Sequence, residues 1–423
     1  MLFDDIIGQN RTKSFLLQLA RSERVPHALL FLGPTGAGNL ALALAFAQVL
    51  QCEAPPGPPG EREGEKPLAS LRGDAGLTSI SPPPGGACGT CNACRKAAQF
   101  THPDIHFSFP TVGTNAVSTD FLKEWRAALS ENPCLDANTW LQRLGAENKQ
   151  GNITKDECNA IIKKLSLKAF EGRYKILVMW LPEYLGKEGN RLLKLIEEPP
   201  ENTIFLLAAE NQDLILNTIL SRCQLVKTGR LSDEEVAAGL VRQRQLDPAR
   251  ARQIAFLADG DFNAALQLAD NPENDDARLL LDWLRKCWRG NGVELVRWTE
   301  DFAKLGRENQ KQFLHYGLHF LREMMMMTVA PPVPPGGEEG DASPASLRSE
   351  TKGWPSSPPP GGARLRPEEL VAAQNMAKVL NFDKIVQVVE ILNDNIYYVE
   401  RNANPKILFL DTSIQLNRIL KSA

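Results

Sequence analysis

The sequence of 423 residues predicts an α/β domain built on a parallel sheet, followed by helical domains. Continuously apolar runs of strand length occur at 27–33, 175–181 and 203–209. Such runs are typical of parallel strands that are buried on both faces. The first run leads through a glycine-rich turn into a helical segment at 39–52. From about residue 231 onward only helical spacing remains, which predicts that the rest of the chain is helical.

Proline, glycine and asparagine mark the ends of the predicted elements. The segment "GKEGNRLLKLIEE", between the second and third strands, has helical spacing and stops at Pro199 and Pro200. Beyond it, "SDEEVAAGLVRQRQL", "PARARQIAFLA" and "FNAALQLA" predict three short helices. Two longer amphipathic helices close the chain, with "NANP" as their turn and Pro405 opening the last one.

Two segments of similar sequence interrupt this order, at 58–87 and 334–363, and both end in "SPPPGGA". They are rich in Pro, Gly, Ser and charge, so they bury too little apolar surface to offset their chain entropy. We predict disordered surface inserts at 54–87 and 330–366, with a proline-rich docking site as the alternative. Because closure entropy grows slowly with loop length, the host elements should keep their architecture.

Composition excludes several classes of protein. With 43% hydrophobic and 23% charged residues, the chain has an ordinary globular composition. A net charge of −3 supplies no basic field for a free-standing DNA-binding protein. The longest apolar stretches are far shorter than the ~20 residues of a membrane-spanning helix, and the acidic start "MLFDDIIGQN" is unlike a leader. We therefore expect a cytoplasmic protein with no membrane contact.

Four of the eight cysteines have the spacing of a metal site. Cys88, Cys91 and Cys94 follow the pattern C-x₂-C-x₂-C, and Cys52 lies at the end of the preceding helix. In a reducing compartment such cysteines are ligands more often than disulfides. Four thiolates leave no position for water, which predicts a closed structural zinc site. Four ordinary buried thiols are the alternative.

The stretch "GPTGAGNL" at 33–40 begins like a phosphate-binding loop. In that pattern a lysine reaches the β- and γ-phosphates and a hydroxyl holds Mg²⁺. Asn39 and Leu40 stand in those two places. Gly33, Gly36 and Gly38 are kept, and we interpret them as residues of a tight strand-to-helix turn. Residual nucleotide binding through backbone N–H groups is the alternative.

Several motifs together give a resemblance to a known family. They are "FDDIIGQ", "HALLFLGPTGAG", "LSLKAFEGRYKILVM", "NRLLKLIEEPPENTIFLLAAEN" and "TILSRCQ". With them the chain resembles bacterial clamp-loader subunits of the AAA+ class, over nearly its whole length outside the inserts. The resemblance implies an AAA+ core with a P-loop-like parallel sheet at 1–229, carrying a Cys₄ zinc module at 52–94. It also implies a helical lid at 230–272 and an all-α collar domain at 273–423.

Within that family, the sequence resembles the non-hydrolysing delta-prime (δ′) stator subunit. The family pattern has acidic residues where "ILVMWLPEY" places Trp180 and Leu181, and a phosphate-sensing arginine where "GDFNAAL" places Asn263. Together with Asn39 and Leu40, these changes imply that the chain has no functional ATP site and is not an ATPase by itself. An ATP-hydrolysing γ/τ-type subunit is the alternative.

The motif "SRC", Ser221 to Cys223, resembles the family motif that carries an arginine finger. The resemblance implies that Arg222, next to Ser221, reaches the ATP site of a neighbouring subunit, where a positive charge accelerates phosphoryl transfer. A surface arginine paired with a local carboxylate is the alternative. The implied partners are γ/τ and δ subunits in a pentameric ring of the DNA polymerase III holoenzyme. Sliding clamp and primed DNA would be engaged through the assembled complex.

Overall fold

The computed structural model describes residues 1–22, 24–53, 86–145, 151–270, 276–329, 367–377, 380–401 and 403–421. The chain divides into two compact units, Met1–Asn271 and Pro272–Ala423. The predicted inserts at 54–87 and 330–366 lie outside the described residues, apart from Gly86 and Ala87. No α-helix among the described residues combines the length and the apolar character that a transmembrane span requires.

The first unit contains a five-stranded parallel sheet with the strand order β2-β3-β4-β1-β5. The three central strands are the continuous apolar runs that the sequence predicts, which confirms the parallel α/β core. The two edge strands have four residues each, and β5 buries only Val226, so neither has a long apolar run. The strands are β1 (Ala28–Leu32), β2 (Ile105–Ser108), β3 (Lys175–Trp180), β4 (Thr203–Ala209) and β5 (Gln224–Lys227).

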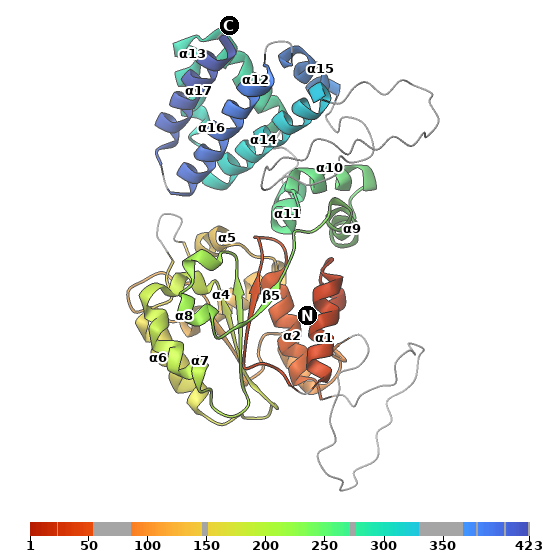
Figure 1. Cartoon of the computed structure of the whole chain (residues 1–423), viewed down its shortest axis with the longest axis vertical. Coiled ribbons are helices and arrows are strands. Elements are labelled where there is room, and N and C mark those ends of the chain that lie inside the picture. Colours follow the sequence, from red (N-terminus) through yellow and green to blue (C-terminus); the bar gives the residue numbers. More distant parts are fainter. Residues whose placement is uncertain are drawn as a thin grey trace, which may run out of the picture. The chain divides into compact units, whose positions relative to one another are not determined.

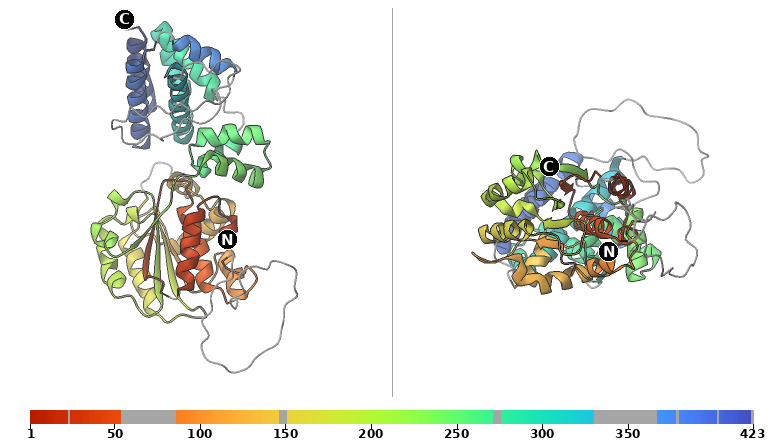
Figure 2. Two further views of the ribbon diagram at one scale, coloured as in Figure 1. Left: turned by 45° about the vertical axis from the view of Figure 1, so that its right-hand side comes forward. Right: turned by 90° about the horizontal axis from the view of Figure 1, so that it is seen from below.

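Helices cover both faces of the sheet (Figure 1, Figure 2). Alternate residues of each strand face opposite layers: Phe31 packs with the α2 side, whereas Leu30 packs with the α6 side. The α2 layer includes η1 (Phe3–Asp5), α1 (Asn10–Arg21), α2 (Asn39–Gln51), α3 (Asn92–Ala98), η2 (Ser118–Phe121), α4 (Leu122–Glu131) and α5 (Ala137–Arg143).

The opposite layer differs in one respect from the sequence prediction. A continuous helix between β3 and β4 was expected, but Gly186 has non-helical backbone angles there. The segment is therefore a 3₁₀ stretch followed by a short α-helix, and the prediction was wrong in its first part. This layer consists of α6 (Lys155–Ser166), η3 (Pro182–Leu192), α7 (Leu193–Glu197), η4 (Gln212–Leu214) and α8 (Asn217–Leu220).

Three short helices follow the sheet, as predicted: α9 (Asp233–Arg244), α10 (Pro248–Ala258) and α11 (Phe262–Asp270). Ser232 and Glu235 form a capping box at the start of α9, and Asp247 caps α10 ahead of Pro248. The three helices have an apolar cluster of their own, centred on residues such as Leu240. Their assignment as a separate lid domain stays a prediction.

The second unit is helical throughout its described residues, which confirms the predicted fold class for this region. Its core is aromatic: the rings of Trp283 and Trp298 stack, and Phe302 packs against Phe409. The indole of Trp283 donates a hydrogen bond to Ser413 at 2.9 Å. The helices are α12 (Asp276–Arg289), α13 (Gly292–Phe302), α14 (Arg307–Val329), α15 (Pro367–Met376), α16 (Phe382–Glu400) and α17 (Pro405–Lys421).

Candidate functional site

The glycine loop at 33–38 connects the carboxyl end of β1 to α2. Gly36 and Gly38 have φ angles of 72° and 92°, in the left-handed region that favours glycine. At Gly33 the constraint is space, because a Cβ atom there would lie 2.0 Å from the hydroxyl oxygen of Thr228. The three glycines therefore serve a tight turn that lies against the protein's own backbone.

Asn39, in the position of the expected lysine, turns its side chain into the protein. It is 8% exposed, and its Nδ2 donates to the carbonyls of Gly33 at 2.6 Å and Ala209 at 3.0 Å. Its Oδ1 accepts a hydrogen bond from the hydroxyl of Thr228. Both N–H groups and the oxygen of this amide are satisfied within the fold. The amide thus ties the loop to the carboxyl ends of β4 and β5.

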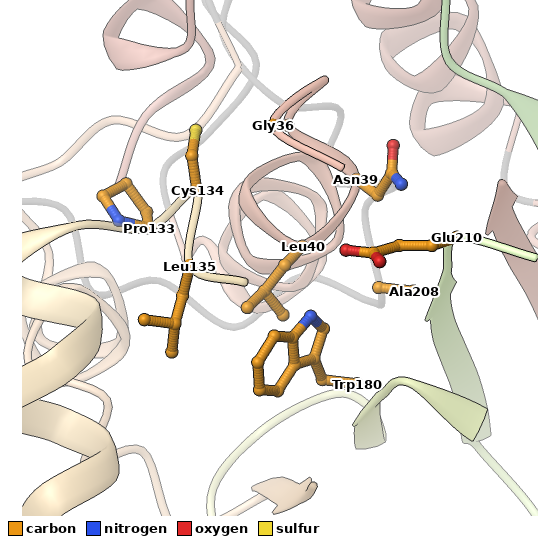
Figure 3. A pocket seen from close by; sticks show the side chains of 10 residues that line it. Gly36, Asn39, Leu40, Pro133, Cys134, Leu135, Trp180, Ala208 and Glu210 are labelled. Atoms are coloured by element: carbon orange, nitrogen blue, oxygen red, sulfur yellow. The ribbon is translucent and has the colours of Figure 1, made fainter. Parts of the chain in front are cut away.

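Leu40 and Trp180 line a small cavity beside the glycine loop. Leu40 is 4% exposed and Trp180 is 3% exposed, and Leu40 points toward the Trp180 indole (Figure 3). The cavity that remains has a volume of about 20 Å³, which is room for about one water molecule. It is lined by Gly36, Gly38, Asn39, Leu40, Pro133, Cys134, Leu135, Trp180, Ala208 and Glu210.

Two glutamates lie at the carboxyl edge of the sheet beside this cavity. Glu183 accepts hydrogen bonds from the N–H groups of Glu210 at 2.6 Å and Asn211 at 2.8 Å, while burial raises its pKa. Burial also raises the pKa of Glu210 to about 8, against the opposing effect of a hydrogen bond from Thr35. Glu210 was missed at the sequence level, although an acid directly after a buried strand is a signal for a residue at this edge.

The start of α11 closes over the loop. The N–H of Phe262 donates to the carbonyl of Gly36 at 3.3 Å, and a Cβ atom on Gly36 would lie 1.8 Å from the Asp261 carboxylate. Burial raises the pKa of Asp261 to about 6. The first turn of α11 therefore occupies the space directly above the glycine loop.

Asn263, in the position of the expected sensor arginine, also makes internal contacts. It is 4% exposed, donates to the carboxylate of Asp136 and accepts from the side chain of Asn132 at 2.6 Å. Asp136 is at the same time the N-cap of α5, accepting from the N–H of Thr139 at 2.8 Å. Asn263 therefore links α11 to α5.

Arg222 lies outside the loop region, just before the amino end of β5. Its side chain is 32% exposed and forms an ion pair with Glu197. The guanidinium also donates to the carbonyl of Thr218 at 2.6 Å and the hydroxyl of Ser221 at 3.2 Å. Local partners thus hold a positive charge in a defined orientation at the protein surface. The alternative interpretation, a surface arginine paired with a local carboxylate, expects such partners as well.

The four cysteines of the predicted metal site come together. Their Sγ atoms all lie within 4.8 Å of one another, and those of Cys88 and Cys94 are 3.8 Å apart. A tetrahedral zinc ion with Zn–S bonds of about 2.3 Å places its sulfur ligands about 3.8 Å apart. The cluster therefore has the ligand set and the spacing for a zinc ion, although 35 residues separate Cys52 from Cys88.

Backbone N–H groups point at the sulfur atoms of this cluster. Cys88 N–H donates to Cys52 Sγ at 3.2 Å, Cys91 N–H to Cys88 Sγ at 3.3 Å, and Cys94 N–H to Cys91 Sγ at 3.4 Å. Such donors orient and stabilise thiolate ligands. Contact with Cys52 and burial raise the pKa of Cys94, because both disfavour its thiolate form. A cation placed among the sulfur atoms would offset this effect and stabilise the thiolates.

The chain is similar to subunits of DNA polymerase III. A family profile described as "DNA polymerase III, delta subunit" matches residues 75–232. The tau subunit of DNA polymerase III from Bacillus subtilis (strain 168) is 25% identical over 78% of this chain and 51% of its own length. The delta' subunit from the same organism is 24% identical over 64% of this chain and 62% of its own length. The profile match and these relatives support a place for this chain among the clamp-loader subunits of DNA polymerase III.

The chain matches tau and delta' relatives at nearly the same identity, so similarity alone does not distinguish these subunits. Its match spans between about half and two thirds of the length of these two relatives. A gamma subunit-related protein from Thermotoga maritima has a solved structure with 12% identity and a TM-score of 0.37, covering 95% of this chain and 99% of that one. The family profile includes Arg222 and three of the four clustered cysteines but not the glycine loop.

Proposed function

We propose that this clamp-loader subunit is the non-hydrolysing delta-prime (δ′) stator of an AAA+ ring and supplies Arg222 to the ATP site of a neighbouring subunit. The observation that carries the proposal is the state of Asn39. An amide that is fully satisfied by Gly33, Ala209 and Thr228 has no donor left for a phosphate. A lysine in the same place makes charge-assisted hydrogen bonds worth about 1.5–3 kcal/mol each.

The surroundings of Asn39 support the same conclusion. Leu40 offers no oxygen to Mg²⁺, a cation that takes oxygen ligands. Glu183 directs one carboxylate oxygen to two backbone N–H groups of its own fold. The side chains of Leu40 and Trp180 line the cavity beside the loop, so apolar groups stand where the expected site has polar ones. Each part of the expected nucleotide site is thus occupied by protein contacts.

Arg222 has what a finger in trans requires. It lies at an exposed edge, and Glu197, Thr218 and Ser221 hold its guanidinium in one orientation. A neighbouring γ-phosphate, with its greater charge, would compete with the single carboxylate of Glu197 for the guanidinium. In the best-studied GTPases such an arginine is worth about 10³–10⁵ in rate. Ser221 acts as a positioning residue for the guanidinium.

The same proposal assigns the other features of the chain. The four clustered cysteines hold a structural zinc ion and stabilise the module at the end of α2. The helical second unit forms the collar through which δ′ joins γ/τ and δ subunits in a pentameric ring. The ring loads the sliding clamp onto primed DNA during replication, and this chain contributes to DNA binding through the assembled complex.

Reconstitution tests the finger. In a loader assembled from this protein with tau-type and delta-type subunits, Arg222→Ala should lower ATP turnover by about half or more, because one site loses its trans charge. The matched control is Arg191→Ala, since Arg191 is also exposed and pairs with a nearby acid, Glu188. Equal turnover of the Arg222 variant and the wild-type complex would reject the finger assignment.

A second candidate function is that of an ATP-hydrolysing γ/τ-type subunit. The tau relative from Bacillus subtilis matches over a larger share of this chain than the delta' relative does, 78% against 64%. An ATPase would bind a fluorescent ATP analogue with Mg²⁺ and turn over in isolation. The δ′ proposal expects neither. If the isolated chain hydrolyses ATP and Asn39→Ala abolishes that activity, the γ/τ-type function replaces the δ′ proposal.

A further inference from the structure

A cavity lies beside the cysteine cluster, at the carboxyl end of α2. Its volume is about 120 Å³, which is room for several water molecules. It reaches the surface, because the exposed residues Glu53 and Arg173 are among those that line it. Cys52, one of the four clustered cysteines, and Ala20 of α1 also line it. A small molecule can therefore approach the cluster from this side.

Three of the four clustered cysteines are accessible to solvent. Cys52, Cys88 and Cys91 are half-buried, whereas Cys94 is fully buried. A structural zinc site needs four ligands but no exposure of them. Thiolates that solvent can reach are the ones that oxidants modify. Of the three accessible residues, Cys52 is the one that lines the cavity.

The other four cysteines are poor targets for the same chemistry. Burial raises the pKa of Cys134 and Cys287 to about 12. It also raises the pKa of Cys158 and Cys223 to about 11. These groups are therefore neutral thiols near pH 7, whereas the reactive form of cysteine is the thiolate. Metal binding requires deprotonated cysteines, so the clustered sulfur atoms are thiolates when zinc is bound.

The spacing within the cluster allows two of its sulfur atoms to react with each other. All four Sγ atoms lie within 4.8 Å of one another, and the N–H of Cys88 donates to the Sγ of Cys52 at 3.2 Å. Cysteines that respond to oxidants are often placed next to a second cysteine that forms a disulfide with them. Cys52 has three such neighbours in the cluster.

We propose that Cys52 is a reversible oxidation site for hydrogen peroxide and that its oxidation opens the zinc site. This role of Cys52 rests on the zinc site of the proposed function. The Cys52 thiolate attacks one peroxide oxygen, the O–O bond breaks, and hydroxide leaves with the electron pair, which gives a sulfenic acid. A neighbouring thiolate then attacks the Cys52 sulfur, so that an S–S bond forms, the S–O bond breaks and a second hydroxide leaves. The two sulfur atoms together lose two electrons to the peroxide, and two protons from solvent convert the hydroxides to water.

The disulfide weakens the connection between two helices. It removes two of the four sulfur ligands, and the remaining two do not complete a tetrahedral Cys₄ site. Cys52 is the C-cap of α2 and Cys91 is the N-cap of α3, so loss of the ion loosens the contact between these helix ends. Thiols reduce such a disulfide by exchange, after which the cluster binds zinc again. Oxidation therefore lowers the stability of the first unit reversibly.

Zinc release from the full chain tests this inference. Hydrogen peroxide is added to the zinc-loaded protein, and a chromogenic chelator records the released ion. We expect about one zinc ion and about one disulfide per chain. Peptide mass spectrometry of samples quenched with acid at early times should find Cys52 in the disulfide, with Cys158 and Cys287 still reduced. Dithiothreitol and added zinc should restore the zinc content and the melting temperature.

Filling the cavity should slow the reaction without changing the ligands. Ala20→Leu places a larger side chain in the cavity, and we expect zinc release to slow about fivefold, because oxidation follows the accessibility of the thiolate. The matched control is Ala372→Leu, since Ala372 is also half-buried on a helix, α15, and this variant should react like the wild type. Equal initial zinc content and melting temperature show that both variants fold.

The outcomes are distinguishable. If the purified protein neither contains zinc nor binds added zinc, the proposed zinc site fails and this inference fails with it. Zinc that stays bound in peroxide, or a first disulfide without Cys52, overturns the inference alone. Equal rates for Ala20→Leu and wild type, or an equal slowing by Ala372→Leu, also overturn it, because the cavity is then not the route of access. If Ala20→Leu does not fold, the peptide map of the wild type decides.

Discussion

The two ends of helix α2 differ in how far the protein satisfies its own polar groups. At its amino end, the glycine loop, Asn39 and Thr228 satisfy one another's hydrogen bonds. At its carboxyl end, Cys52 meets three other cysteines, and the backbone there offers only N–H donors to the sulfur atoms. The first region has closed on itself, whereas the second still presents a converging set of ligand atoms.

The difference gives a physical criterion for deciding whether a site keeps its ligand atoms available for a ligand. Ligand atoms that are kept for a ligand leave part of their bonding capacity unused by the protein. At the glycine loop the amide of Asn39 makes all its hydrogen bonds to the protein. Leu40 and Trp180 are buried beside it. At the cysteine cluster the four sulfur atoms lie within 4.8 Å of one another. The predictions below test this contrast, beginning with the largest expected effect.

Removing the metal from the cysteine cluster should have the largest effect. We expect one equivalent of zinc per chain, and Cys94→Ser should abolish it and lower the free energy of unfolding by about 5 kcal/mol, since metal binding is coupled to folding. Elemental analysis and thermal melting measure both quantities. Cys287→Ser is the control, because Cys287 is buried in the other unit. Full zinc content in the Cys94 variant would contradict the Cys₄ assignment.

Stability should depend on pH through Glu210. Its pKa of about 8 in the folded protein exceeds the ordinary value of 4.5, so between these values the folded state keeps a proton that the unfolded state has lost. Stability is therefore full below about pH 4.5 and falls as pH rises through 8.

Between pH 6 and 8 this contribution amounts to about 2–3 kcal/mol. Glu210→Gln should flatten that part of the profile, measured by urea unfolding. Asp261, with a pKa of about 6, contributes mainly at lower pH. Glu201→Gln, at an exposed position, serves as the control. A wild-type profile that rises toward pH 8 would contradict the burial of Glu210.

Asn39→Ala should destabilise the protein by about 2 kcal/mol. It removes the side-chain donor to the carbonyl of Gly33 in a buried environment and one of the two donors to the carbonyl of Ala209, which keeps the N–H of Gly33. In an active nucleotide site, loss of this side chain would instead weaken ATP binding with little change in stability. Chemical denaturation and nucleotide titration of the same variant separate the two readings. Asn190→Ala, an exposed asparagine on η3, should change neither quantity.

Arg222→Ala should have the smallest effect on stability, about 0.5 kcal/mol or less. Its ion pair with Glu197 is partly exposed, and such pairs contribute little to folding. Comparison of its unfolding curve with that of Arg191→Ala measures the difference. A loss above about 2 kcal/mol would mean that Arg222 is a structural residue and would weaken its assignment as a finger.

Much of the fold could be predicted from local pattern. The central strands β3 and β4 are buried on both faces, so each is a continuous apolar run in the sequence. The edge strand β5 was not anticipated, because it is paired and packed on one side only. The helix expected from Gly186 onward is 3₁₀ as far as Leu192, since a helical pattern of apolar residues does not distinguish a 3₁₀ segment from an α-helix.

The candidate sites also differ in how much of each could be predicted from local pattern. The cysteine cluster could be predicted, because zinc imposes a short spacing on three of its ligands. The partners of Asn39 could not, since Ala209 and Thr228 are distant in sequence and become neighbours only at the sheet edge. Glu210 and Asp261 were missed for that reason.

The sequence by itself determined that Asn39 and Leu40 stand in the lysine and hydroxyl positions of the glycine-loop pattern and that four cysteines have the chemistry of a metal site. Both follow from residue type and short spacing. Only the tertiary structure decided that Asn39 is satisfied from within, that Cys52 reaches Cys88, and that Arg222 lies at the surface. These facts depend on contacts between distant segments. For Asn39, parallel strands create such contacts by aligning their carboxyl ends at one edge of the sheet.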